Sequence, residues 1–167
     1  MNRARVGIMA AAIFAVASVA FAQAKPDFSG TWTLDPEASN MGGAPGGGGG
    51  GGGRGMMTGP ITIKVAGDVL TIDRMQGEAK VTTTLNLAGQ PTENQMAGRQ
   101  GAAIAAKYVS KWDGAKLVTT ITSEGPNGPI TRTETRWLEG STLVVETNRT
   151  GRDGSPMTTK LVYKKTT

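Results

Sequence analysis

The sequence predicts an all-β protein, an antiparallel up-and-down meander of about 8–9 strands that closes into a barrel. From residue 59 onward, Thr and Val residues alternate with polar ones at a period of two, as they do in half-buried strands. The connections between these runs are short and contain Gly, Asn and Asp, which tight hairpin turns prefer. No amphipathic helix of useful length follows residue 22.

The N-terminus is typical of a secretory signal peptide, which we assign to residues 1–22. Arg3 and Arg5 precede an almost continuous apolar stretch, Val6–Val19, and Ala20–Ala22 supplies the small residues of a signal-peptidase site. The apolar stretch is shorter than the roughly 20 residues of a membrane-spanning helix, which disfavours an uncleaved anchor. We therefore expect cleavage after Ala22, a periplasmic or secreted protein, and no transmembrane segment in the mature chain.

The mature chain is expected to form one domain, residues 27–167, since domains usually contain about 100–200 residues. Its N-terminal segment, residues 23–41, contains a first strand at Phe28–Leu34. Residues 42–58 are expected to form a Gly-rich flexible loop, because this composition offers almost nothing to bury. A phosphate-binding loop is disfavoured there, because no Gly-Lys-Ser/Thr opens a helix. Residues 59–167 supply the remainder of the barrel.

Eight further strands are predicted in this remainder. One connection, Gly89–Gly101, is longer than the others, and its Ala-rich end is compatible with a helical turn. The eight strands are Pro60–Ala66, Val69–Met75, Lys80–Leu87, Ala102–Trp112, Lys116–Thr122, Ile130–Leu138, Thr142–Arg149 and Met157–Lys165.

Alternation along the strands predicts which side chains face the interior. The apolar members of the inner face are Ile61, Ile63, Val65, Leu70, Ile72, Val81, Leu85, Leu87, Leu117, Ile121, Trp137, Leu143, Val145, Leu161 and Tyr163. The same face receives Thr83, Thr119, Thr131, Thr133, Thr135, Thr147 and Thr159. These threonines are either core residues with bonded hydroxyls or the lining of a solvated cavity, and the sequence leaves both open.

Most charged residues fall on the opposite face of the predicted strands. Arg132, Glu134 and Arg136 alternate along one strand and are expected to form a solvent-facing ladder, with an anion-binding stripe as the alternative. Removing the signal peptide changes the balance of basic to acidic residues from 18:13 to 16:13, so the mature chain is about +3. No run of four or more basic residues occurs, and we therefore expect no binding of nucleic acid.

Residues 28–34 read Phe-Ser-Gly-Thr-Trp-Thr-Leu, which resembles the first strand of the calycin barrels, the lipocalins and fatty-acid-binding proteins. The rest of the chain, with the turn Trp112–Leu117 and the final strand Thr159–Lys165, is similar to a family of small secreted bacterial proteins. The resemblance implies a calycin-like barrel. In lipocalins the matching Trp packs across the closed end beneath an Arg of a late strand, which implies that Trp32 is a structural plug with Arg149 as its partner.

The composition argues against catalysis. The chain has no His and no Cys, which excludes a Ser-His-Asp triad, a thiol nucleophile, disulfides and thiolate metal sites. Asp113, Glu139 and Asp153 stand beside Gly in predicted turns, where turn hydrogen bonding explains them. We expect a protein that is not an enzyme, with no catalytic residue, metal or cofactor. Two carboxylates brought together from distant strands are the remaining route to an enzyme.

A binding role is the preferred hypothesis. Aromatic rings beside Thr hydroxyls on an inner face suit a small apolar or amphipathic ligand. The alternative is a ligand-free, envelope-associated structural or interaction domain, and the sequence indicates neither a partner nor an oligomeric state. The candidate ligand-binding residues are Tyr108, Trp112, Thr133, Thr135, Trp137 and Tyr163.

Overall fold

The computed structural model describes residues 25–41, 59–97, 103–125, 128–151 and 154–166. The predicted signal peptide, residues 1–22, and the predicted Gly-rich loop, residues 42–58, lie outside the described residues. Within these ranges the chain is all-β, with no α-helix and therefore no helix suited to crossing a membrane.

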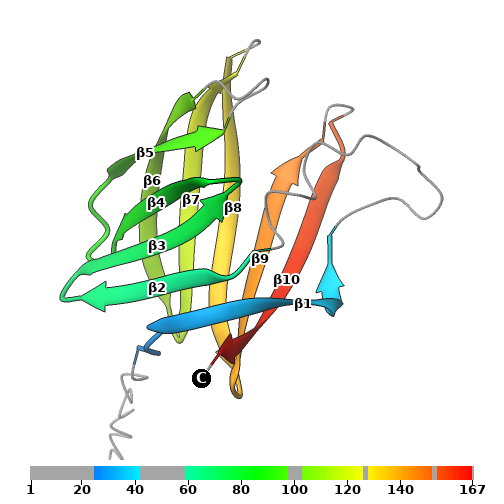
Figure 1. The fold of residues 1–167 in the computed structure, drawn as a ribbon. Coiled ribbons are helices and arrows are strands. Elements are labelled where there is room, and N and C mark those ends of the chain that lie inside the picture. Colours follow the sequence, from blue (N-terminus) through cyan, green and yellow to red (C-terminus); the bar gives the residue numbers. More distant parts are fainter. Residues whose placement is uncertain (1–24, 42–58, 98–102, 126–127, 152–153, 167) are drawn as a thin grey trace, which may run out of the picture.

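Ten antiparallel strands form a single sheet in the order β4-β3-β2-β1-β10-β9-β8-β7-β6-β5. Consecutive strands pair along the chain except β4 and β5, and the pairing of β1 with β10 joins the first and last strands (Figure 1). The predicted barrel is thereby confirmed, with ten strands in place of the expected eight or nine. The strands are β1 Gly30–Asn40, β2 Ile61–Ala66, β3 Val69–Gln76, β4 Ala79–Asn86, β5 Thr92–Ala97, β6 Ala103–Asp113, β7 Lys116–Gly125, β8 Gly128–Glu139, β9 Thr142–Thr150 and β10 Pro156–Thr166.

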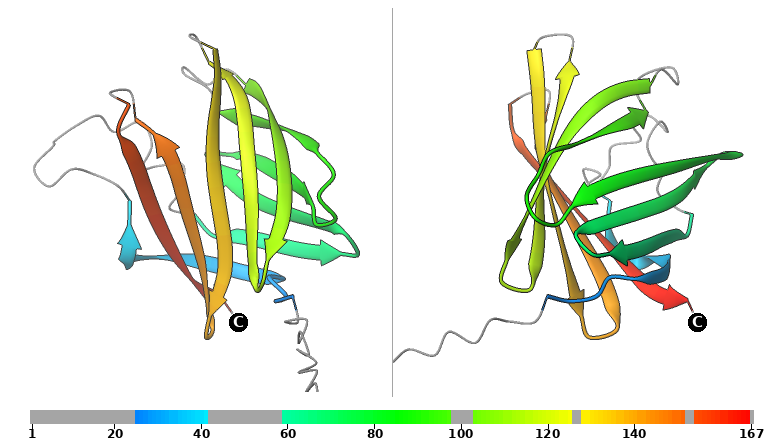
Figure 2. Two further views of the ribbon diagram at one scale, coloured as in Figure 1. Left: turned by 180° about the vertical axis from the view of Figure 1, so that it is seen from behind. Right: turned by 90° about the vertical axis from the view of Figure 1, so that its left-hand side faces the viewer.

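The two halves of the sheet run in different directions. Strands β1–β4 cross strands β6–β10, and the apolar faces of both halves point into the space between them (Figure 2). In the sheet order β3 and β8 are five positions apart, so these two strands stand on opposite walls of the barrel (Figure 1).

The long connection predicted at Gly89–Gly101 is wrong, because Thr92–Ala97 is strand β5 and pairs with β6. Its sequence, Thr-Glu-Asn-Gln-Met-Ala, lacks the apolar alternation that identifies a strand, since the inward position 94 is occupied by Asn. An edge strand with polar residues on both faces therefore leaves no signal in the hydropathy pattern.

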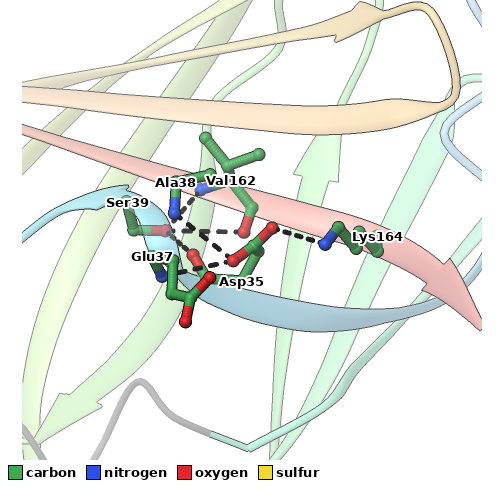
Figure 3. A network of polar contacts seen from close by, with 6 residues as sticks. All are labelled: Asp35, Glu37, Ala38, Ser39, Val162 and Lys164. Atoms are coloured by element: carbon green, nitrogen blue, oxygen red, sulfur yellow. Dashed lines mark hydrogen bonds and ion pairs between the residues drawn. The ribbon is translucent and has the colours of Figure 1, made fainter.

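Strand β1 extends beyond the predicted end at Leu34, and continues past Pro36 to Asn40 through a bulge. At the bulge the Ser39 hydroxyl replaces a ladder group: the backbone N–H of Val162 donates to Ser39 Oγ at 2.9 Å, as Figure 3 shows. The Ser39 hydroxyl in turn donates to the Asp35 carbonyl at 2.6 Å. A side chain thus maintains the pairing with β10 where the backbone register shifts.

The Asp35 carboxylate braces the same bulge. It accepts hydrogen bonds from the backbone N–H groups of Glu37 and Ala38 at 3.2 and 3.3 Å, and lies 2.7 Å from Lys164 Nζ of β10 (Figure 3). The Lys164 hydrogen bond, followed by that from Ala38, lowers the pKa of Asp35 below its ordinary value. The carboxylate therefore stays ionised at neutral pH.

Aromatic rings fill one end of the barrel. Phe28 is fully buried and stacks on Trp112 with ring centroids 5.9 Å apart. The Trp32 indole, 2% exposed, donates its Nε1–H to the Phe28 carbonyl at 2.9 Å. The segment before β1 thereby connects the first strand to the end of β6, and this end of the barrel is closed by packed side chains.

Candidate functional site

Strand β8 turns its charged side chains into the barrel. Arg136 is only 4% exposed, and Glu134 lines an internal cavity beside it. The prediction of a solvent-facing ladder at Arg132, Glu134 and Arg136 is therefore wrong. The error lies in the choice of inward residues: Leu138, not Trp137, packs against the core, and moving the inward set by one residue exchanges the two faces of a strand.

The cavity is small, about 40 Å³. Arg74 of β3 reaches it from the wall opposite Glu134 and Arg136 of β8. Its other lining residues are Gly59, Ile61, Ile72, Met75, Val145, Thr147, Leu161 and Tyr163. A polar group of a few heavy atoms fits this space, with apolar side chains beside it.

Four charged residues form what we call the charged cluster: Arg74, Arg132, Glu134 and Arg136. The Glu134 carboxylate accepts a hydrogen bond from Arg136 Nη2. Burial by itself raises the pKa of Glu134, but the guanidinium groups of Arg136, Arg132 and Arg74 outweigh it and hold the pKa below its ordinary value. Glu134 is therefore an ionised carboxylate at neutral pH and neutralises one of three guanidinium charges.

Three guanidinium nitrogens of this cluster are buried and lack a hydrogen-bond acceptor among the described residues. They are Arg74 Nε, Arg132 Nε and Arg136 Nη1. The Nη2 group of Arg132 donates only a weak hydrogen bond, to the Met96 thioether at 3.5 Å. Buried N–H donors are nearly always paired in folded proteins, so these three indicate a place for an acceptor that the chain itself does not supply.

Tyr108 of β6 and Tyr163 of β10 border the charged cluster. Both side chains are buried, and burial raises the pKa of each phenol. The nearby charges that act on their pKa values include Glu134, Arg74 and Arg136 for both rings. Each hydroxyl therefore stays protonated at neutral pH and is available as a hydrogen-bond donor. These two predicted site residues lie inside the barrel, as expected.

The other four predicted ligand-binding residues do not join them at the cluster. Trp112 faces inward but belongs to the closed end, where it stacks on Phe28. Thr133, Thr135 and Trp137 alternate with the inward charged residues of β8 and so point outward, which makes the prediction that they face inward wrong. The Trp137 ring instead lies beneath two surface cations, with Lys116 Nζ 4.7 Å and Lys160 Nζ 5.9 Å from its centroid.

The inferred pairing of Trp32 with Arg149 is also wrong. Trp32 lies opposite Lys165 at the end of β10, whereas Arg149 lies opposite Met157 at the start of that strand. The cation above the Trp32 ring is Lys165, whose Nζ is 5.4 Å from the ring centroid. Arg149 is exposed and lies opposite Arg132 in the β8–β9 ladder.

The sequence did contain a signal for one cluster residue. On the predicted strand Val69–Met75, the alternation that places Leu70 and Ile72 inside also places Arg74 inside. For β8 no such signal exists, because Thr and charged residues alternate and hydropathy places the charges outward.

One seam of the barrel lacks a backbone ladder: β4 and β5 are the two edges of the sheet. A buried side-chain amide bridges them. Asn94 Oδ1 of β5 accepts from the Thr84 backbone N–H at 2.7 Å, and Asn94 Nδ2 donates to the Thr84 carbonyl at 2.9 Å. Thr92 Oγ1 donates to the same carbonyl at 2.7 Å. The seam is therefore closed by side chains at this point.

No known family model and no curated protein sequence matches this chain. Solved structures match its fold. Human cRBP IV is 20% identical with a TM-score of 0.56, covering 84% of this chain and 99% of that protein. A protein described as the REP1-NXSQ fatty acid transporter is 14% identical with a TM-score of 0.53, covering 83% and 96%. Apo lipid binding protein 8 of Caenorhabditis elegans is 12% identical with a TM-score of 0.54, covering 83% and 95%. The fold is thus a calycin-like barrel.

Proposed function

We propose that this protein is an exported, non-catalytic barrel that binds a small amphipathic molecule through an anionic head group. The observation that carries the proposal is the set of three buried guanidinium nitrogens without an acceptor, on Arg74, Arg132 and Arg136. An anionic group in the cavity gives Arg74 and Arg136, which line it, an acceptor, and it offsets the positive charge of the cluster that Glu134 does not neutralise. The N-terminal sequence, typical of a signal peptide, supports export.

The size of the cavity limits what binds without rearrangement. About 40 Å³ accommodates a head group, whereas a drug-sized ligand fills about 300–1,000 Å³. An apolar tail therefore needs side chains to move. Met75, which is 51% exposed, and the partly buried Met96 are suited to this, because the unbranched thioether adapts its shape at low cost.

The names of two of the similar structures, a fatty acid transporter and a lipid binding protein, support a carrier role. The small cavity favours the alternative, a ligand-free structural or interaction domain. The two functions differ in one measurable respect: the carrier binds an anionic amphiphile in its interior and the interaction domain does not.

Calorimetric titration with dodecanoate and with dodecanol tests the proposal. We expect dodecanoate to bind at least tenfold more tightly, because dodecanol lacks an anionic group to accept hydrogen bonds from the guanidinium groups. Arg74→Met should weaken dodecanoate binding by about 10–100-fold, the equivalent of one charged hydrogen bond of about 1.5–3 kcal/mol.

Lys64→Met is the matched control, since Lys64 is an exposed cation on neighbouring β2 and its loss changes the net charge equally. Dodecanoate affinity should be the same in this variant as in the wild type. Absence of binding by both dodecanoate and dodecanol would favour the ligand-free interaction domain.

A further inference from the structure

The charge of the cluster does not balance. Three guanidinium groups, on Arg74, Arg132 and Arg136, face one carboxylate, that of Glu134. Among the cavity-lining residues that the structure describes, Glu134 is the only acidic one. The part of the sequence outside the described residues adds a single acidic side chain, Asp153, which stands next to Arg152. The described cluster therefore has a net charge of about +2 at neutral pH, since Arg and an ionised Glu carry unit charges.

From this charge balance we infer that the head group carries two negative charges, as a phosphate monoester does, and not the single charge of a carboxylate. The inference rests on the proposed function and specifies the ligand class for the same site. A carboxylate compensates one of the two excess positive charges and leaves the other uncompensated inside the barrel. A dianion compensates both excess charges. Unpaired buried charge is unfavourable, so the dianion is the better complement.

The positions of the unpartnered donors agree with a phosphate. Arg74 Nε comes from β3, and Arg132 Nε and Arg136 Nη1 come from β8 on the opposite wall (Figure 1). The three terminal oxygens of a phosphate monoester are strong acceptors that point in different directions, and Arg is especially suited to them. The protonated hydroxyl of Tyr163, which lines the cavity, is a further donor from β10.

The protein offers no titrating side chain that would obscure this charge dependence. Between pH 5.5 and 8, Glu134 stays ionised because its pKa is lowered, and Tyr108 and Tyr163 stay protonated because their pKa values are raised. The chain has no His. The second ionisation of a phosphate monoester has a pKa of about 6, so the ligand alone changes charge over this range.

Calorimetric titration of the full chain with dodecyl phosphate, dodecanoate, dodecanol and inorganic phosphate at pH 8 and pH 5.5 tests the inference. At pH 8 we expect dodecyl phosphate to bind at least tenfold more tightly than dodecanoate. At pH 5.5 about three quarters of the phosphate is monoanionic, so its affinity should fall about fourfold. Dodecanoate affinity should change less than twofold.

Arg132→Met lowers the net charge of the cluster by one and keeps the hydrogen bond of Glu134, because that bond comes from Arg136 whereas Arg132 contacts Met96. This variant should bind dodecyl phosphate and dodecanoate with affinities within threefold of each other. Lys111→Met removes an exposed, outward cation of β6 and should keep the full tenfold preference. Circular dichroism establishes that both variants fold.

The outcomes separate the two proposals. Dodecanoate binding as tightly as dodecyl phosphate at pH 8 overturns the dianion and leaves the proposed function standing. Absence of binding by all four compounds overturns both. Inorganic phosphate binding as tightly as dodecyl phosphate supports the dianion but identifies a free anion as the ligand, which contradicts the amphipathic tail.

Discussion

Glu134 is the residue that limits the repulsion among the three arginines of the charged cluster. Burial raises the pKa of Glu134, but Arg136, Arg132 and Arg74 lower it by more, so the pKa lies below its ordinary value. A group with a lowered folded-state pKa contributes stability above its unfolded pKa, and that stability is lost as the pH falls through the folded-state value. The acid-sensitive range attributable to Glu134 therefore lies below the ordinary Glu value of about 4.3.

Replacing the Glu134 carboxylate by an amide tests whether its ionised form stabilises the folded protein. At pH 7, Glu134→Gln should lower the free energy of unfolding by about 3 kcal/mol, because the buried Arg136 loses its ion-pair partner. The difference between wild type and variant should shrink as the pH falls below about 4.3 towards pH 3. Urea unfolding at both pH values measures it.

The surface carboxylates with lowered pKa values, Asp35 and Asp73 among them, are present in both proteins and cancel in this comparison. A difference that stays constant from pH 7 to pH 3 would contradict the assignment of an ionised Glu134 in the folded protein.

At the scale of the element, the seam between β4 and β5 depends on one side chain. The Asn94 amide makes both hydrogen bonds that a paired strand would make to Thr84. Asn94→Ala leaves the Thr84 backbone N–H without that acceptor, at a cost of about 1–3 kcal/mol. Amide hydrogen exchange at Thr84 should accelerate by more than the global loss of stability explains.

Gln95→Ala is the matched control on the same strand, since Gln95 is exposed and points away from the interior. It should leave exchange at Thr84 unchanged. Unaltered exchange in Asn94→Ala as well would show that the amide does not close the seam.

The elements also show what the sequence could and could not predict. Strands such as β3 and β9, in which two buried apolar residues stand two positions apart, were predictable almost to the residue. Strand β5 was not, because its inward residues include Asn94, and a polar edge strand resembles a loop. Strand β8 was placed correctly along the chain but with its faces exchanged. Its inward side chains include charged residues that pair with each other, whereas hydropathy places charged residues outward.

The same exchange explains why the candidate site was predicted only in part. Tyr108 and Tyr163 lie on strands whose apolar neighbours fix the register, so their inward direction was correct. The inward direction of the arginines on β8 can be recognised only from the fold, which brings them together with Glu134 and with Arg74 of the opposite wall. Electrostatic compensation between strands distant in the sequence is a tertiary property that periodicity does not contain.

At the scale of the whole molecule, closure links the two ends of the chain. The first and last strands pair as β1 and β10, and the segment before β1 folds back so that Phe28 reaches Trp112 of β6. In the sheet order β1 and β6 stand five positions apart, on opposite walls. The plug at the closed end therefore connects walls that share no backbone hydrogen bond.

Phe28→Ala should consequently destabilise the entire barrel. The ring is fully buried, and its removal leaves Trp112 without its stacking partner, at an expected cost of about 3–5 kcal/mol. Urea unfolding followed by Trp fluorescence should remain one cooperative transition at a lower midpoint, because the plug belongs to the same core as both walls. Ile130→Ala, at an exposed position of β8, should change the midpoint little. A loss below 1 kcal/mol for Phe28→Ala would mean that strand pairing alone closes the barrel.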